Sequence, residues 1–176
     1  IVNSQCGTLF PFERGSDALA SSEGIAENLV CLGDVLKKAG YKQTYMGGAE
    51  LAFAKKGDFL AAHGFDITLG QEKWVERGIY PNKNQFGISD EKLFELSLEQ
   101  LEYLQSSNSP WNLTLLTIGT HIPGYRYDSC LPYPNNEFPL VQALHCTDQL
   151  IGRWIDQLKE KGYLDNTILV ITADHQ

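Results

Sequence analysis

The stretch Asn166-Thr-Ile-Leu-Val-Ile-Thr172 has the apolar, β-branched pattern of a buried strand, and it leads directly into Ala173-Asp174-His175. A buried strand holds its backbone rigidly, so the turn after it is the first place where polar side chains can meet a ligand. Carboxylate oxygen and neutral imidazole nitrogen together suit hard and borderline divalent cations. The stretch therefore predicts two metal ligands, Asp174 and His175, although the same dipeptide is also typical of an ordinary capped turn.

A second predicted strand ends in the same way. Residues 113–118 are apolar, and they lead into Gly119-Thr120-His121. Parallel strands place their carboxyl ends along one edge of a sheet, and ligands bind beyond that edge. We therefore expect His121, Asp174 and His175 to lie at the same edge, close enough to share a ligand.

Helical and strand patterns alternate along the rest of the chain. Apolar residues recur at three- and four-residue steps over residues 23–39, 90–104 and 139–161, which predicts helices, and further strands are predicted at residues 42–46 and 65–69. This order is typical of parallel strands joined by right-handed crossovers. The predicted fold is an α/β sandwich with a mostly parallel sheet and helices on both faces.

Length and charge limit the classes of function. The chain has 176 residues, enough for one domain with a sizeable core, and its 22 acidic and 14 basic residues give a net charge of −8. Without a cluster of basic residues, a nucleic-acid surface is not expected. No apolar run approaches the length of a membrane-spanning helix, and no signal peptide is evident. Because the chain begins at Ile1 without Met, we interpret residues 1–176 as part of one longer catalytic domain, whose membrane anchor would lie outside this chain.

The four cysteines form two local groups, Cys6 with Cys31 and Cys130 with Cys146. An even number is compatible with disulfides in an oxidising compartment and equally with four buried thiols in a cytosolic enzyme. Three connectivities are available to four cysteines, and the sequence-local one closes the shortest loops.

Several short motifs resemble, in order and spacing, the phosphoglycerol transferase I family of the alkaline phosphatase and sulfatase superfamily, which is related to the lipoteichoic acid synthases. The resemblance spans nearly the whole chain. It is carried by Ser4-Gln-Cys-Gly7, Cys31-Leu-Gly-Asp-Val-Leu36, Phe53-Ala54, Lys56-Gly57, His63-Gly-Phe-Asp66, Thr120-His-Ile-Pro123 and Asp174-His175.

The resemblance implies a membrane-anchored enzyme at the periplasmic face of the inner membrane, which moves phosphoglycerol from phosphatidylglycerol onto a periplasmic glucan. A divalent cation (manganese, zinc or magnesium) and a threonine-linked intermediate are implied as well. Asp174 and His175 are similar to metal ligands of the family, and His121 to its substrate-side histidine. Phe53 and Lys56 fall near an aromatic and a basic residue that contact phosphoglycerol, although Lys55 is an alternative to Lys56. The extracytoplasmic resemblance also predicts the disulfides Cys6–Cys31 and Cys130–Cys146.

The chain departs from the family at its start. The family's threonine nucleophile would precede Ile1, so this chain alone is expected to be inactive and to bind metal weakly. The sulfatase pattern Cys-x-Pro-x-Arg is not met at Cys6-Gly-Thr-Leu-Phe10. Alternatives are a phosphoethanolamine transferase or phosphodiesterase of the same superfamily, or an inactive domain that binds glycan or lipid.

Overall fold

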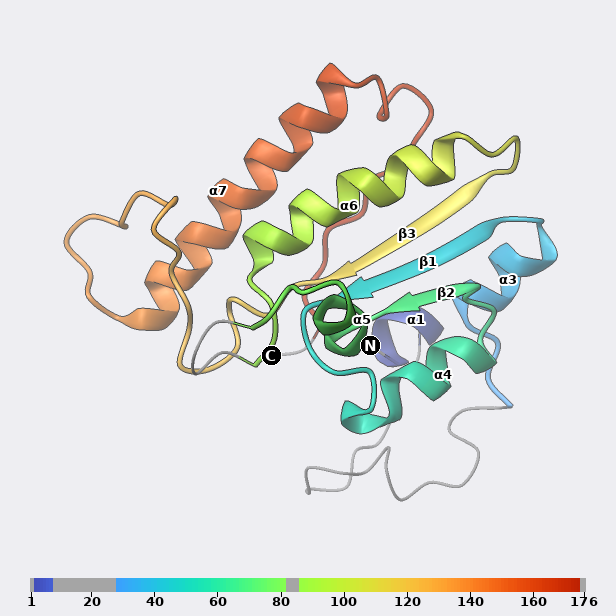
Figure 1. Cartoon of the computed structure of the whole chain (residues 1–176), viewed down its shortest axis with the longest axis horizontal. Coiled ribbons are helices and arrows are strands. Elements are labelled where there is room, and N and C mark those ends of the chain that lie inside the picture. Colours follow the sequence, from blue (N-terminus) through green and yellow to red (C-terminus); the bar gives the residue numbers. More distant parts are fainter. Residues whose placement is uncertain (1, 8–27, 82–85, 175–176) are drawn as a thin grey trace.

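The computed structural model describes residues 2–7, 28–81 and 86–174. Their elements, in chain order, are α1 (Val2–Cys6), α3 (Leu32–Lys38), β1 (Lys42–Gly47), the 3-10 helix η1 (Phe53–Lys55), α4 (Lys56–Ala62), β2 (Ile67–Leu69), α5 (Gln71–Glu76), α6 (Asp90–Gln105), β3 (Trp111–Leu116) and α7 (Pro139–Glu160). Helices and strands alternate, as the sequence predicts (Figure 1).

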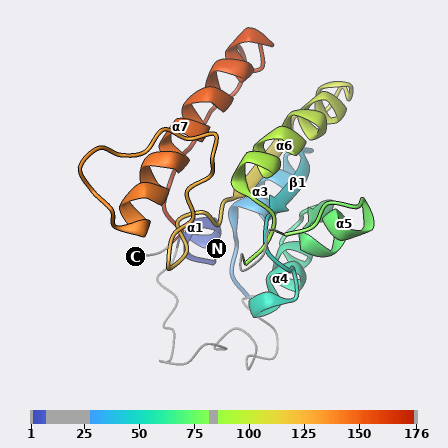
Figure 2. The same cartoon turned by 60° about the vertical axis from the view of Figure 1, so that its left-hand side comes forward.

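The described strands form a parallel sheet in the order β2-β1-β3. Thr44 of β1 is in register with Ile67 on one side and with Leu113 on the other. Helices α6 and α7 lie side by side on one face, whereas α3 and α4 lie on the far side of the strands (Figure 2). The predicted fold class, a parallel α/β sheet covered on both faces, is confirmed.

Successive residues of β1 are buried in different cores, because side chains of a strand point alternately to its two faces. Tyr45 packs with Phe59 and Leu60 of α4, and Met46 packs with Trp74 and Leu93. A third core joins α6 to α7, and there the Trp154 indole N–H donates to Ser97 Oγ at 2.9 Å. These cores hold the carboxyl end of β1 rigidly between the two helical layers.

Two disulfides join the predicted pairs, Cys6 with Cys31 and Cys130 with Cys146. The first ties α1 to the start of α3. The second ties the loop after β3 to α7, and Cys130 and Cys146 are both buried in the core between α6 and α7. The predicted connectivity is confirmed.

Removing the second disulfide should destabilise the protein strongly. Its cysteines are 16 residues apart, and opening a loop of that size lowers the free energy of unfolding by roughly 3 kcal/mol. Denaturant unfolding of the double variant Cys130→Ala/Cys146→Ala measures this difference. Titration of thiols in unreduced, denatured protein should detect none at these two positions, and reactive thiols there would contradict the pairing.

Two predicted elements differ from the structure. A helix is predicted over residues 23–39, but within the described residues it begins only at Leu32. Cys31 has an extended backbone and forms the N-cap, because its N–H donates to the Asp34 carboxylate and its sulfur is bonded to Cys6. Residues 23–27 lie outside the described residues. The predicted strand 166–172 is wrong, since these residues pair with no described strand.

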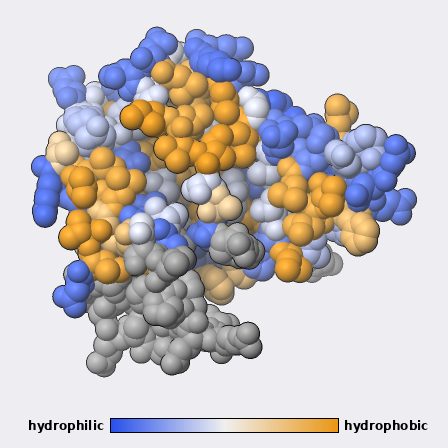
Figure 3. Space-filling view, turned by 180° about the vertical axis from the view of Figure 1, so that it is seen from behind, coloured by the Kyte–Doolittle hydropathy of each residue, from blue (hydrophilic) through white to orange (hydrophobic). Residues whose placement is uncertain are grey.

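Residues 167–173 instead leave large apolar side chains exposed. Figure 1 draws this segment behind α6 and β3, so it belongs to the face seen in Figure 3, where hydrophobic residues form broad areas. Ile168 is 91% exposed and Val170 75%. An apolar, β-branched pattern favours an extended strand, but a neighbouring strand is needed to bury its apolar side chains.

None of the described helices is long and apolar enough to cross a bilayer.

Candidate functional site

The candidate site lies beyond the carboxyl end of β1, where two backbone segments cross in close contact. Gly48 follows the strand, and its carbonyl accepts a hydrogen bond from the Ile88 N–H at 3.1 Å. A Cβ atom on Gly87 would lie 2.1 Å from the Gly48 carbonyl oxygen, so side chains are excluded from this crossing. The crossing carries Phe86 to the edge of the sheet.

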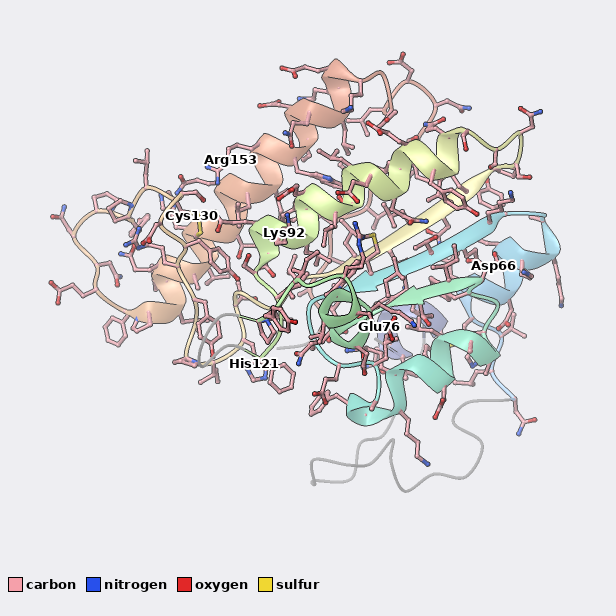
Figure 4. All side chains as sticks on the ribbon, viewed as in Figure 1. Asp66, Glu76, Lys92, His121, Cys130 and Arg153 are labelled. Atoms are coloured by element: carbon pink, nitrogen blue, oxygen red, sulfur yellow. A yellow bond between two sulfur atoms is a disulfide. The ribbon has the colours of Figure 1, made fainter. Side chains whose placement is uncertain are left out.

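Phe86 joins two of the predicted site residues into an aromatic row. Its ring is stacked on the His121 imidazole, with centroids 5.0 Å apart and an interplanar angle of 1°, and Phe53 meets it edge-on at 5.0 Å. His121 is exposed in the turn after β3 (Figure 4). The three rings form a row that is partly open to solvent and has one polar member, His121.

Lys56, the first residue of α4, is 6% exposed. Burial lowers the pKa of its ammonium group, and the carboxylates of Glu72 and Asp174 act in the opposite direction without cancelling the effect. Asp174 also contributes to the raised pKa of Tyr45, whose main cause is burial. The Asp174 carboxylate therefore acts electrostatically on both the Lys56 ammonium group and the Tyr45 phenol.

The backbone before Lys56 is strained. Ala54 and Lys55 both have left-handed conformations, with φ of 53° and 49°, which non-glycine residues rarely adopt. Glu72 holds the preceding turn, because its carboxylate accepts the Leu51 N–H at 2.9 Å. Strain of this kind persists where the surroundings fix it, and it is frequent at ligand sites. Here it buries Lys56 while Phe53, three residues earlier, stays exposed.

A second group of metal-type ligands lies at the opposite end of β1. Ligand atoms of Cys31, Asp34 and His63 lie within 4.8 Å of one another, but the Cys31 sulfur is already bonded to Cys6. Burial raises the pKa of Asp34, but hydrogen bonds from the Cys31 N–H and the His63 ring outweigh it and hold that pKa below its usual value. We interpret the Asp34–His63 pair, at 2.8 Å, as a structural contact between α3 and α4.

The structure thus brings the sequence-predicted residues together in two pairs. His121 and Phe53 share the Phe86 ring, and Lys56 lies near Asp174. His175 lies outside the described residues. Phe86 was not among the predicted site residues, and the available signal for it was an aromatic residue directly before Gly87.

The sequence model of the sulfatase family matches residues 8–176, and the chain belongs to this family. It is similar to phosphoglycerol transferase I of Xanthomonas campestris pv. campestris, with 34% identity over 99% of this chain and 26% of that protein. The corresponding protein of Salmonella arizonae is 35% identical over 99% of this chain and 24% of its own length. The chain thus spans about a quarter of the length of these relatives, and the predicted resemblance is confirmed.

Solved structures give the same fold. A protein in the alkaline phosphatase superfamily from Vibrio parahaemolyticus superposes with a TM-score of 0.74 at 22% identity, over 93% of this chain and 39% of that one. The lipoteichoic acid synthase LtaP from Listeria monocytogenes gives a TM-score of 0.64 at 23% identity, over 78% of this chain and 35% of that one. These similarities support the fold.

Proposed function

We propose that this chain belongs to the catalytic domain of a metal-dependent phosphoglycerol transferase, which moves phosphoglycerol from phosphatidylglycerol onto a periplasmic glucan. The observation that carries the proposal is the similarity to phosphoglycerol transferase I over 99% of the chain. The grouping of cationic, aromatic and acidic side chains at the carboxyl edge of the sheet supports it, because ligands of open α/β sheets bind there.

In this proposal the Lys56 ammonium and the His121 imidazole bind the phosphate oxygens of the donor, and the rings of Phe53 and Phe86 pack against its glycerol. Lys56 is suited to this role because a buried ammonium group gains more from an anionic partner than an exposed one does. The exposed His121 edge is suited to donate a hydrogen bond or a proton to the departing oxygen. Its stacking on Phe86 would hold the ring in one plane.

Asp174 and His175 would hold the divalent cation (manganese, zinc or magnesium). The donor set fits, since a carboxylate beside an imidazole suits each of these ions, and the Asp174 carboxylate acts electrostatically on Lys56. When bound, the ion would withdraw charge from the transferring phosphoryl group. Asp174 also keeps negative charge beside Lys56, which favours the charged form of that amine.

The nucleophile is proposed to be a threonine outside this chain, as the resemblance implies. Its oxygen would form a bond to phosphorus as the bond to the diacylglycerol oxygen breaks, and a glucan hydroxyl would then displace the threonine. The two disulfides suit the periplasmic face of the inner membrane, where such bonds form and persist. Contact with the membrane would be made through segments outside this chain.

The donor headgroup separates this proposal from its alternatives. Vesicles of phosphatidylglycerol and of phosphatidylethanolamine, given separately to an active preparation with glucan and manganese, should release diacylglycerol from phosphatidylglycerol alone. Release from phosphatidylethanolamine would favour a phosphoethanolamine transferase. Release without modification of the glucan would favour a phosphodiesterase, and binding without turnover of either lipid would favour an inactive lipid- or glycan-binding domain.

Lys56→Met should raise the KM for phosphatidylglycerol by about 10- to 100-fold, because the phosphate would lose a buried cation. Lys55→Met should change it by less than about 3-fold, since Lys55 is held in a left-handed turn and is less buried. Lys159→Met, an exposed change at the end of α7, is the control. A larger effect at Lys55 than at Lys56 would transfer the anion-binding role to Lys55.

A further inference from the structure

The turn that carries His121 is held by a short series of backbone hydrogen bonds. The His121 N–H donates to the Ile118 carbonyl at 2.9 Å, and the Tyr125 N–H donates to the Gly119 carbonyl at 2.8 Å. Ile118 and Gly119 therefore set the path of residues 118–125. The position of the imidazole depends on how these two residues are fixed.

One carboxylate binds both of them. Asp90, the first residue of α6, is fully buried, and its Oδ1 accepts the Ile118 N–H at 2.8 Å while its Oδ2 accepts the Gly119 N–H at 2.9 Å. The two backbone N–H groups are adjacent in the chain, so the carboxylate fixes the plane between them. It links the rigid start of α6 to the carboxyl end of β3.

We propose that Asp90 is a positioning residue, whose carboxylate fixes the turn that presents His121 to the donor phosphate. This inference rests on the proposed function, because it assigns His121 a place beside the transferring group. Asp90 does not belong to the aromatic row of Phe53, Phe86 and His121. It acts through Ile118 and Gly119.

The surroundings of Asp90 leave little room for another arrangement. Its own N–H donates to the hydroxyl of the buried Tyr127 at 3.1 Å, so the downstream end of the turn is fastened to the same residue. A Cβ atom on Gly119 would lie 2.5 Å from Asp90 Oδ2, so a side chain there would displace the Asp90 carboxylate. Ser89 caps α6 by accepting the Lys92 N–H, so Asp90 is not needed as the N-cap.

Protonation of Asp90 should loosen the turn. Burial raises the pKa of Asp90 to about 6, although the N–H groups of Ile118 and Gly119 act in the opposite direction, and Glu91 adds to the increase. Among the described residues Tyr127 also faces Asp90, and burial raises the pKa of its hydroxyl, so it stays neutral in this range. Below pH about 6 one carboxyl oxygen carries a proton, and one of the two backbone N–H groups loses its acceptor.

The test is Asp90→Asn, which keeps the shape but turns an amide N–H₂ toward one of the backbone N–H groups. In an active preparation, kcat/KM for phosphatidylglycerol should fall about 10- to 100-fold, as for other residues that orient an active-site group. The acid limb of its pH profile near 6 should disappear. Asp128→Asn, the same change at an exposed position beside Tyr127, should leave both unchanged. Tyr127→Phe keeps both hydrogen bonds that the Asp90 carboxylate accepts, so kcat/KM should fall by less than about 3-fold.

A measurement without substrate keeps the outcomes separate. Amide hydrogen exchange over residues 118–125, corrected for the intrinsic rate, should speed up in Asp90→Asn and in the wild type below pH about 6, but not in Asp128→Asn. Unchanged exchange, or unchanged kcat/KM in a folded Asp90→Asn, would overturn the proposal. If the variant does not fold, the wild-type pH series decides. If the wild type does not transfer phosphoglycerol, the proposed function fails, and exchange still decides whether Asp90 holds the turn.

Discussion

In an active preparation, Asp174→Asn is expected to lower phosphoglycerol transfer by roughly 10³-fold, because even a partner outside the ligand shell of a metal typically contributes 10- to 100-fold. Asparagine keeps the size of the side chain and one oxygen but removes the negative charge that binds a divalent cation. It also removes a carboxylate that raises the pKa of Lys56, so that amine would be charged less often. The affinity for manganese, measured by calorimetry, should fall in parallel.

Asp165→Asn is the matched control, since Asp165 is exposed at the beginning of the same segment of chain. It should leave transfer and manganese affinity unchanged. Asp174 is partly exposed, and its replacement should shift the midpoint of unfolding little in the absence of metal. Full activity of Asp174→Asn, or unchanged manganese affinity, would contradict the assignment of Asp174 as a ligand.

His121→Ala is expected to lower kcat by about 10²- to 10³-fold, the usual contribution of a positioned proton donor or of one hydrogen bond to a developing negative charge. The KM should change less, because Lys56 would still bind the phosphate. The side chain is exposed, so the loss should come without loss of stability. Steady-state kinetics with phosphatidylglycerol vesicles separates kcat from KM.

His145→Ala tests whether any histidine beside an aromatic ring has this effect. His145 lies on α7 and meets Tyr133 edge-on, with centroids 5.2 Å apart, so its surroundings are comparable. Its replacement should change kcat by less than about 2-fold. Equal losses in both variants would indicate a general effect of the substitution. A fully active His121→Ala would remove His121 from the proposed site.

The parallel sheet could be predicted because its strands are marked locally. Residues 42–46 are framed by Gly40 and Gly47-Gly48, and the structure places β1 at Lys42–Gly47. The helix predicted from Pro139 onward is confirmed as α7, since proline suits the first helical position. Hydrophobic periodicity and the Gly and Pro residues that end helices and strands are properties of a short stretch of sequence. They identify helices and strands more reliably than they identify which of these pack together.

Elements that depend on distant residues were harder to predict. The start of α3 is set by Cys31, which is held by a cysteine 25 positions earlier. Residues 166–172 have the composition of a strand, but whether such a run enters a sheet depends on a neighbouring edge rather than on its own sequence. Neither the bond from Cys31 to a distant cysteine nor the presence of a neighbouring strand edge can be read from the local sequence pattern.

The same distinction applies to the candidate site. His121, Phe53, Lys56 and Asp174 could be named from short motifs, but their contacts could not. Phe86 reaches His121 because the chain crosses at Gly48 and Gly87, and Asp90 reaches Ile118 because α6 begins beside the end of β3. An aspartate at the start of a predicted helix is ordinarily explained by its interaction with the helix dipole. The sequence therefore offered no reason to expect that Asp90 also binds the backbone of the turn after β3.

The most direct test of the account follows the phosphoglycerol group itself. Phosphatidylglycerol labelled in its headgroup glycerol is incubated with an active preparation and a periplasmic glucan, with manganese or with excess chelator. Label is expected to appear on the glucan, together with an equal amount of diacylglycerol, and excess chelator is expected to abolish both. Label transfer that continues undiminished in chelator, or turnover of a sulfate ester in place of the lipid, would contradict a metal-dependent phosphoglycerol transferase.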